Sequence, residues 1–492
     1  MKLKTIISAA LAAILACACA PKSVKPQVVD SLPEIWPDYV GVTVPVGIAP
    51  LNFGMAEPRK WLALQVWAGG ISGEPIHVSG KDHVEFPEEE WHALLKANRG
   101  GSVKVIVCAK DLTGWKKFRE FELAVSEDRI DSHLCYRLLP PSYVNYGKMG
   151  IYQRELGSFK ESTVLDNSQW TGCVNCHSFR KNDPSEFSLH IRGEHGATLL
   201  RLKDGMEAWN TRTDSTSGFC VYPYWHPGGR YIAYSTNNTR QVFHTGGKKM
   251  VEVYDSASDV QVLDLQTMEL ILPDATRSTA DWESFPAFSA DGRGLFFVSA
   301  RGCGNGETGI REVRYDLCCT SFDPQTGAVG SDVTVLFDAS SSGKSVSMPR
   351  PSPDGKFLLM TIADYGSFGI WHPEADLILL DLRNGMVNRM QNVNSPDAES
   401  YHSWSSNGRW IVFGSRRDDH CTTRAYMAHV NSNGRCGKAF LLPQKDPRKY
   451  YLEQICSYNV PEFVTGPVQL DAAEAVRKIK SEERKDFKYT KR

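Results

Sequence analysis

The sequence predicts an all-β protein, with an N-terminal β-sandwich of the immunoglobulin type followed by a β-propeller of five or six blades. Three observations predict this fold class. Short β-rich segments separated by turn residues fill residues 38–127. A turn-and-strand motif recurs four times in the second half, starting at residues 222, 285, 348 and 401. Helix signals are confined to one short segment near residue 90 and to the C-terminal tail.

The N-terminus has the features of a lipoprotein signal peptide, which we assign to residues 1–20. Lys2 and Lys4 give it a basic start, and the apolar run that follows is too short to span a bilayer as a mature helix. The run ends in "ILAC", which resembles a bacterial lipobox with Cys17 as the lipid-bearing residue, and the alternative is ordinary signal cleavage near Ala20. No later apolar run reaches membrane-spanning length. We therefore expect a lipid-anchored envelope protein, on the periplasmic side because "APKSVK" after the anchor contains no acidic run.

Charge and cysteine content limit the classes of function. The chain of 492 residues has 56 Lys and Arg against 57 Asp and Glu, interleaved throughout, so we expect no nucleic-acid partner. In an oxidising compartment the 13 cysteines can form disulfides, metal sites or haem linkages. The disulfide candidates are Cys303 with Cys318 or Cys319, and Cys108 with Cys135.

The β-sandwich is assigned to residues 21–135. Segments such as "WLALQVWAG" and "GSVKVIVCAKD" have the composition of strands and are separated by turns. One helix interrupts them in "FPEEEWHALLKANRGG", with Pro87 at its start, three glutamates in its first turn and Gly100 beyond its end. Residues 136–169 are aromatic and punctuated by proline and glycine, which predicts an ordered connector.

Four repeats carry the strongest signal in the chain. They are "YPYWHPGGRYIAYSTN", "FPAFSADGRGLFFVSAR", "MPRPSPDGKFLLMTIAD" and "YHSWSSNGRWIVFGSRR", each with a short strand, a glycine-containing turn and a second strand. The repeats resemble TolB-type β-propeller blades, whose signature is an aromatic-x-Ser-Pro-Asp-Gly-Arg/Lys turn followed by an apolar strand. The resemblance implies a propeller, which we assign to residues 170–465. The charged residues 466–492 are expected to form a solvated helix or tail.

A single C-x-x-C-H motif lies in "WTGCVNCHSF", where the repeat predicts the first strand of a degenerate blade. This spacing is typical of covalent haem attachment: Cys173 and Cys176 would form the thioethers, and His177 would be the proximal iron ligand. The alternatives are a disulfide between the two cysteines, or a zinc or copper site on Cys173, Cys176, His177 and a fourth ligand. The whole chain also resembles a group of bacterial lipoproteins that join a sandwich domain to a TolB-like propeller bearing this motif. That resemblance supports the architecture and supplies no reaction.

The position opposite His177 on a bound haem would be taken by His195 or by solvent. His195 lies in the loop "GEHGAT", which the blade pattern places on the same face as the start of the Cys173 strand. The glycines beside it allow close approach to a planar group. His402, which stands where three repeats have proline, is the second choice. His190 is a weaker candidate, because strand alternation directs it against a neighbouring blade.

The predicted function is that of an envelope lipoprotein whose propeller is a binding or scaffold module, with one c-type haem for electron transfer or redox sensing. Its partner would be an envelope protein or a glycan. One alternative is a haem-free interaction propeller in which the C-x-x-C-H motif is structural or binds a metal. Another is a metal-dependent oligosaccharide lyase, implied by the similarity of the repeats to those of oligogalacturonate lyases. That site would gather His402, Asp364, His372, His420, Arg416 and Arg417 at the channel mouth.

Overall fold

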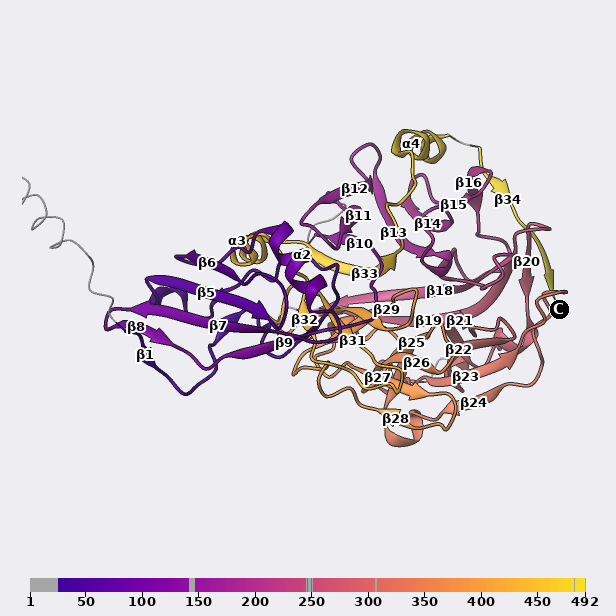
Figure 1. The fold of residues 1–492 in the computed structure, drawn as a ribbon. Helices are drawn as coiled ribbons and strands as arrows, with labels where there is room; N and C mark the ends of the chain where they lie inside the picture. The colour runs from indigo at the N-terminus through magenta and orange to yellow at the C-terminus, as the bar shows by residue number, and fades with distance from the viewer. Residues whose placement is uncertain are drawn as a thin grey trace, which may run out of the picture.

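The computed structural model describes residues 25–140, 147–244, 246, 249, 251–305, 308–481 and 483–491. They form an N-terminal domain and a six-bladed β-propeller that lie side by side (Figure 1). The predicted signal peptide and its Cys17 lie outside the described residues. Nowhere in the described part of the chain is a helix long and apolar enough to cross a membrane.

The N-terminal domain is built on one seven-stranded sheet. Its order is β1 (Gln27–Val28), β8 (Gly114–Lys117), β7 (Ser102–Asp111), β5 (Ala63–Gly70) and β6 (Ile76–Gly80), and β9 (Phe121–Val125) joins β7 to β3 (Thr43–Val44). A separate pair consists of β2 (Ile35–Trp36) and β4 (Gly54–Met55). The immunoglobulin-like sandwich is not confirmed, because the long strand β7 pairs with β5, β8 and β9 and so draws the predicted strands into a single layer.

The one predicted helix of this domain is confirmed as α2 (Glu88–Ala97). Pro87 precedes it, and its first turn holds three glutamates, where negative charge favours a helix N-terminus. Its apolar face packs onto the sheet through Trp91, Leu94 and Leu95, which are buried.

The propeller has six blades, which we number in chain order. Blade 1 consists of β10 (His133–Leu139), β11 (Gly150–Glu155), β12 (Glu161–Asp166) and β33 (Ser457–Val464). Blade 2 consists of β13 (Gly172–Phe179), β14 (Phe187–Gly193), β15 (Ala197–Leu202) and β16 (Gly205–Asn210). Blade 3 consists of β17 (Cys220–Trp225), β18 (Tyr231–Phe243), β19 (Val251–Asp264) and β20 (Glu269–Leu272).

The remaining three blades contain the other predicted repeats. Blade 4 consists of β21 (Trp282–Phe288), β22 (Gly294–Ala300), β23 (Asp316–Ser321) and β24 (Thr334–Phe337). Blade 5 consists of β25 (Ser345–Pro351), β26 (Phe357–Ala363), β27 (Asp376–Asp381) and β28 (Val387–Asn388). Blade 6 consists of β29 (Glu399–Trp404), β30 (Trp410–Ser415), β31 (Arg424–His429) and β32 (Phe440–Leu441).

Blade 1 closes the ring by combining the two ends of the propeller sequence. Strand β33 follows blade 6 and pairs antiparallel with β10, which precedes blade 2. Residues 136–169, expected to be a connector, instead supply most of β10 and the whole of β11 and β12. This closure fixes the number of blades at six.

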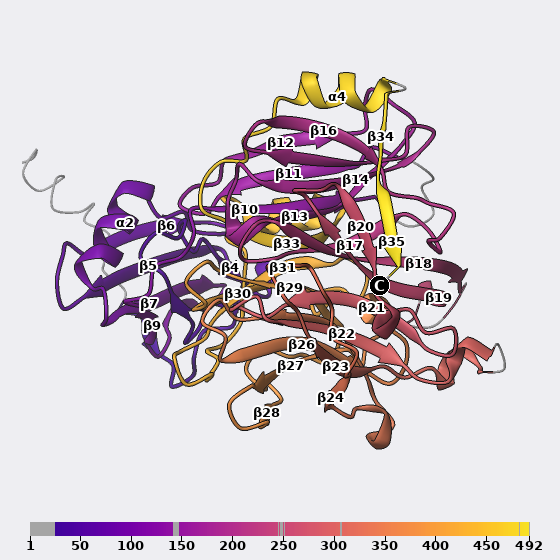
Figure 2. The ribbon, with the colours of Figure 1, turned by 90° about the vertical axis from the view of Figure 1, so that its right-hand side faces the viewer.

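The C-terminal tail is packed against the propeller, which differs from the solvated tail expected. Helix α4 (Ala472–Lys480) lies against β12 and β16, with Ala475, Val476 and Ile479 buried. Beyond it, β34 (Lys485–Asp486) pairs in parallel with β16, and β35 (Lys488–Lys491) pairs in parallel with β20. The tail therefore runs along the outer edges of blades 1 to 3 (Figure 2).

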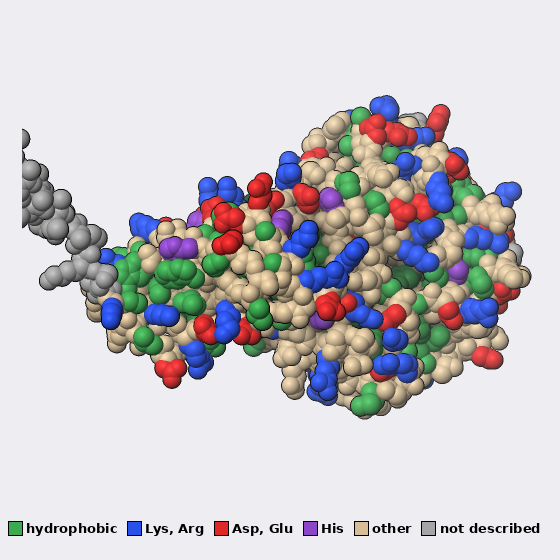
Figure 3. All heavy atoms as spheres, viewed as in Figure 1, with side chains coloured by type: hydrophobic (Ala, Val, Ile, Leu, Met, Phe, Trp, Pro, Cys, Tyr) green, Lys and Arg blue, Asp and Glu red, His purple; other side chains and the backbone are tan. Residues whose placement is uncertain are grey.

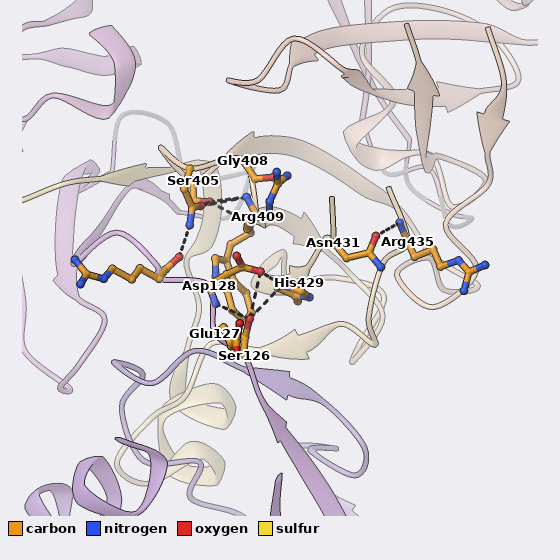
Figure 4. Close-up of polar contacts among 12 residues, drawn as sticks. Ser126, Glu127, Asp128, Ser405, Gly408, Arg409, His429, Asn431 and Arg435 are labelled. Atoms are coloured by element: carbon orange, nitrogen blue, oxygen red, sulfur yellow. Dashed lines mark hydrogen bonds and ion pairs between the residues drawn. The ribbon is translucent and has the colours of Figure 1, made fainter. Parts of the chain in front are cut away.

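Blades 1 and 6 form the contact with the N-terminal domain. The two blades and this domain share one apolar core, in which Val42 and Val44 are joined by Trp410, Met427 and Phe440. At the edge of this contact, Ser126 Oγ and Asp128 Oδ2 lie 3.2 and 2.7 Å from His429 Nε2 (Figure 4).

Basic and acidic side chains are interspersed over both domains on the face shown in Figure 3. The short helix α3 (Pro447–Glu453) precedes β33.

Candidate functional site

The innermost strand of every blade has the same local irregularity. Its pairing is interrupted by a bulge, and the first residue of the bulge has a positive φ of 43 to 55°. These residues are Cys176, Tyr222, Phe285, Met348, Tyr401 and Val460. The residue that follows is proline in four blades and histidine in two: Pro223, Pro286, Pro349 and Pro461, with His177 and His402. Proline suits this position because it has no N–H to give to the interrupted ladder.

His177 of the C-x-x-C-H motif therefore occupies the same blade position as His402. His402 Nε2 donates to the carbonyl oxygens of Met348 and Leu359 in the preceding blade, at 2.8 and 3.1 Å. The equivalent backbone groups of blade 1, those of Val460 and Cys135, lie against the His177 ring. Burial lowers the pKa of His177 to about 4 and that of His402 to about 3, so both imidazoles are neutral at neutral pH.

The two histidines differ in how well their nitrogens are satisfied. Neither ring nitrogen of His177 makes a hydrogen bond of regular geometry, although the side chain is only 2% exposed. In His402 the Nε2 is engaged and the Nδ1 is not. A buried polar nitrogen without a hydrogen bond costs about 1–3 kcal/mol. His177 therefore has fewer satisfied ring nitrogens than His402, and a metal or a hydrogen-bond donor could use the one that is free.

The thiols of the motif lie on β13, Cys173 near its start and Cys176 past its middle, in a positively charged region. Cys173 and Cys176 are free and partly exposed. The charges of Arg137 on β10 and Arg192 on β14 are within electrostatic reach of both thiols. Asn175, in the amide orientation that satisfies both of its ends, accepts from Arg192 Nε at 3.3 Å and donates to a backbone carbonyl at 2.8 Å. This side of the channel combines a dithiol with two guanidinium groups.

The structure places His195 at the same end of blade 2 as Cys173. Gly172 pairs with Gly193, so the loop after β14 lies beside the start of β13. His195 is partly buried, and its carbonyl oxygen accepts from Arg484 Nη2 at 3.4 Å. His190 is buried within the blade, with its Nδ1 3.4 Å from Thr198 Oγ1.

A cavity of about 380 Å³ lies at the other end of the channel, where the inner strands finish. Every blade contributes to its wall, and in five blades one contributor is the residue directly after the proline or histidine: Ser178, Tyr224, Arg350, Ser403 and Glu462. Aromatic rings form much of the remaining wall, from Trp225, Phe288, Tyr401 and Trp404. The indoles of Trp225 and Trp404 are fixed, since their Nε1 atoms donate to the carbonyl oxygens of Ser178 and Arg350 at 3.0 and 2.9 Å.

Three charged residues line this cavity. Arg350 stacks its guanidinium over the Tyr224 ring at 5.3 Å and donates to the Pro349 carbonyl at 3.2 Å. Glu462 Oε1 accepts from the Phe179 N–H at 3.1 Å, yet burial raises its pKa to about 8 against the opposing effects of that N–H and of Arg350. Lys181 stands exposed at the rim. At neutral pH the cavity is therefore positively charged.

Sequence analysis did not single out Arg350, Glu462 or Tyr224. A signal for them exists, because each directly follows the proline of its repeat, in "MPRP", "VPEF" and "YPYW". The residue after this proline is the first one beyond the bulge, and it faces the channel.

The residues expected at a lyase site pair with separate partners. Asp364 bonds to Lys344 at 2.6 Å, Arg417 bonds to Glu399 at 3.0 Å, and His372 Nδ1 lies 3.5 Å from a Glu374 oxygen. His420 contacts Asp397, and Arg416 donates to the backbone of His420. Within the described ranges, no group of three or more His, Cys, Asp or Glu side chains is arranged to hold a metal ion.

This finding applies to the C-x-x-C-H motif as well. Cys173, Cys176 and His177 are not gathered as a zinc or copper site here. The predicted disulfides are also not formed, since all eleven described cysteines are free, Cys108 and Cys135 among them.

Comparison with known proteins gives only distant similarity. No protein-family model matches the chain, and no curated protein is similar to it. Among solved structures it is similar to the periplasmic gluconolactonase of Pseudomonas aeruginosa, with 13% identity and a TM-score of 0.36 over 78% of this chain and 97% of that one. A DUF4784 family protein from Bacteroides caccae has 8% identity and a TM-score of 0.32 over 73% and 95%.

Prolyl oligopeptidase B from Galerina marginata is a third similar structure, with 12% identity and a TM-score of 0.33 over 63% of this chain. The match spans 44% of that enzyme, less than half of its length. The chain contains a six-bladed β-propeller. Its own sheets establish this, and the similarities are too low to carry an activity to it.

Proposed function

We propose that this chain is a lipid-anchored envelope protein whose propeller is a binding module, with its ligand site in the channel cavity. The observation that carries the proposal is enclosure: all six blades line one cavity of about 380 Å³. Its wall combines aromatic and other apolar surface with polar and charged groups that point to one space, which is a composition found in small-molecule sites. A glycan or a segment of an envelope protein is the expected class of partner, and a lipid on Cys17 would hold the module at the membrane.

Blocking the cavity tests this proposal. Ser403 lines it and can be replaced by tryptophan, with Ser341→Trp on an exposed turn outside the cavity as the matched control. A defined library of mono- and oligosaccharides, short peptides and small organic acids is screened against the full chain by native mass spectrometry. We expect at least one compound to bind one per chain, and Ser403→Trp alone to abolish that binding while the near-UV circular dichroism stays native. No binding at all, or equal binding by both variants, would contradict the proposal.

Covalent attachment of haem c is a second candidate, favoured by the thiols. Cys173 and Cys176 are free, partly exposed and set three residues apart, as two thioether bonds require. Arg137 and Arg192 can neutralise the two carboxylates that a haem carries. A bound haem would supply one-electron redox chemistry at this end of the channel. The cysteine side of the motif therefore fits the group.

His177 would fit a haem as an iron ligand under one condition. His177 is neutral and has a free nitrogen, which an iron ligand needs. However, its ring lies against the backbone of Val460 and Cys135, between the blades, as a packing residue would. His177 can reach an iron only if the ring leaves this position. If a second protein ligand held the iron, His195, in the loop beside Cys173, would be the first candidate, and His402, whose Nε2 is already engaged, would be the second.

An absorbance spectrum decides between haem and its absence. The protein is produced together with haem-maturation machinery and run on a denaturing gel. If haem is attached, a Soret band stays with the chain and is lost in the Cys173→Ala, Cys176→Ala double variant. His195→Ala should then convert a low-spin spectrum to a high-spin one. A wild-type chain without the band would remove this candidate and leave the binding proposal intact.

A further inference from the structure

We propose that the channel cavity selects a ligand that has a carboxylate on an apolar or aromatic body, with Arg350 as the group that binds the carboxylate. This inference rests on the binding function proposed above and adds the chemical class of the ligand.

The guanidinium of Arg350 has no anionic partner and would be stabilised by one. Its guanidinium contacts an aromatic ring and donates one hydrogen bond to the Pro349 carbonyl. In the described part of the chain no carboxylate lies within ion-pair distance of it; Glu462, which lines the same cavity, acts on it only at longer range. Burial lowers the pKa of Arg350, which is the cost of holding a poorly solvated cation. A ligand anion would relieve that cost and use the N–H groups that remain.

The position of Arg350 is also fixed in advance. Its backbone carbonyl accepts from Trp404 Nε1 at 2.9 Å, and its side chain is held over Tyr224. Because the guanidinium is already placed, little side-chain freedom would be lost when a carboxylate binds. A planar guanidinium matches the two oxygens of a carboxylate in a bidentate contact.

The charges of the cavity favour a monoanion over a phosphate dianion. Arg350 and Lys181 are the cations that line it, and Lys181 is at the exposed rim. Glu462 lies in the same cavity and is protonated at neutral pH, so its carboxyl group can donate a hydrogen bond to a ligand carboxylate. A second negative charge, as on a phosphate dianion, would enter the cavity without a second cation beside it, because Lys181 lies at the exposed rim. Glu462 itself would repel an anion only above pH 8, where it ionises.

The rest of the wall suits an apolar body. Trp225, Phe288 and Trp404 present aromatic surface, and Pro351 and Pro353 add further apolar area. A volume of about 380 Å³ is near the lower end of the range for ligand sites, which indicates one ring or a short chain.

Calorimetric titration of the full chain with a defined panel tests the inference. The probes are benzoate, 4-hydroxyphenylacetate, indole-3-acetate and hexanoate, each beside its neutral amide, with phenyl phosphate as the dianion. We expect at least one carboxylate to bind one per chain, at least tenfold more tightly than its amide and than phenyl phosphate. Arg350→Gln should weaken this binding at least tenfold, whereas Arg293→Gln, which removes an exposed arginine outside the cavity, should leave it unchanged.

Two further variants keep the test decisive. Arg350→Lys retains the charge without the bidentate edge, so it should restore part of the affinity that Arg350→Gln loses. Affinity in the wild type should fall as the pH rises through 8, and Glu462→Gln should remove that fall. A carboxylate that binds no better than its amide, or whose binding is indifferent to Arg350→Gln, would overturn the inference. If a neutral compound instead binds and Ser403→Trp blocks it, the binding function stands and only the ligand class is wrong.

Discussion

The free energy of unfolding of Glu462→Gln, compared with that of the wild type, should be higher at pH 8 than at pH 5. The carboxyl group lines the channel cavity beside Arg350, and burial raises its pKa from the ordinary 4.5 to about 8. In the unfolded chain the same group ionises near its ordinary value. Between these two values the folded state therefore holds a proton that the unfolded state has lost, so the wild type loses stability as the pH rises. Glutamine has no proton to lose.

The size of the effect follows from the two pKa values. A tenfold change in proton affinity is worth about 1.4 kcal/mol. The interval from 4.5 to about 8 therefore corresponds to an upper value of ~5 kcal/mol. Because Glu462 is only partly buried and faces the cavity, water weakens the effect, and we expect a difference of about 2–4 kcal/mol. The difference should grow between pH 5 and 8 and be constant above pH 9.

The assay is urea unfolding followed by tryptophan fluorescence at one-unit pH intervals from 5 to 9. The measured quantity is the free energy of unfolding of Glu462→Gln minus that of the wild type. Glu283 has a pKa raised to about 8, mainly by burial and also by Asp281, and it contributes its own pH dependence. Glu283→Gln is therefore the control, because it should show the same sign independently of the cavity. Parallel stability profiles for Glu462→Gln and the wild type would refute the reasoning.

Three other predictions concern the packing between blades, the C-terminal tail and the closure of the ring. His402→Ala should destabilise the fold by about 2–4 kcal/mol, since it removes a buried ring and the donor to two carbonyl oxygens; a change below about 0.5 kcal/mol in chemical unfolding would show that those bonds contribute nothing. Ile479→Asp should cost about 3 kcal/mol, because Ile479 is fully buried on the face of α4 that packs on the propeller, and no loss of melting temperature would mean that the tail is solvated after all. Deleting residues 457–492 removes β33 and should prevent cooperative unfolding of the propeller, whereas deleting 467–492 should retain it at lower stability; calorimetric scans that do not distinguish the two deletions would contradict closure by β33.

The sequence was informative where the pattern was local and repeated. Four turn motifs predicted blades 3 to 6, and counting back one period placed Cys173 and His177 on the first strand of blade 2. The pairing of Gly172 with Gly193 agrees with the expected position of the His195 loop. In each case the signal depends on strand length, turn residues and the order of neighbouring strands. These features are set by residues that lie close together in the sequence.

It failed where pairing joins distant segments. Blade 1 was missed because its inner strand, β33, comes from the opposite end of the propeller, and only "VPEF" marks Pro461 as a member of the repeat. The sandwich is not confirmed, and the reason is that alternation shows which residues are strands and not which strands pair. The tail was expected to be solvated because its charge conceals a short apolar stripe at Ala475, Val476 and Ile479.

The candidate site shows the same difference between features set by local sequence and features set by contacts between distant segments. Sequence alone located the cysteines, His177, His195 and His402, but the equivalence of His177 and His402 becomes visible only when all six bulges are compared. Arg350 and Glu462 come from blades 5 and 1, and a cavity between them depends on ring closure.

A crystal structure of the full chain with the tightest-binding carboxylate of the panel tests the central claim most directly. We predict electron density for one ligand inside the channel cavity, with its carboxylate on the Arg350 guanidinium and its apolar body against Trp404 and Phe288. Density for the ligand outside the channel, with the cavity holding only water, would contradict the account.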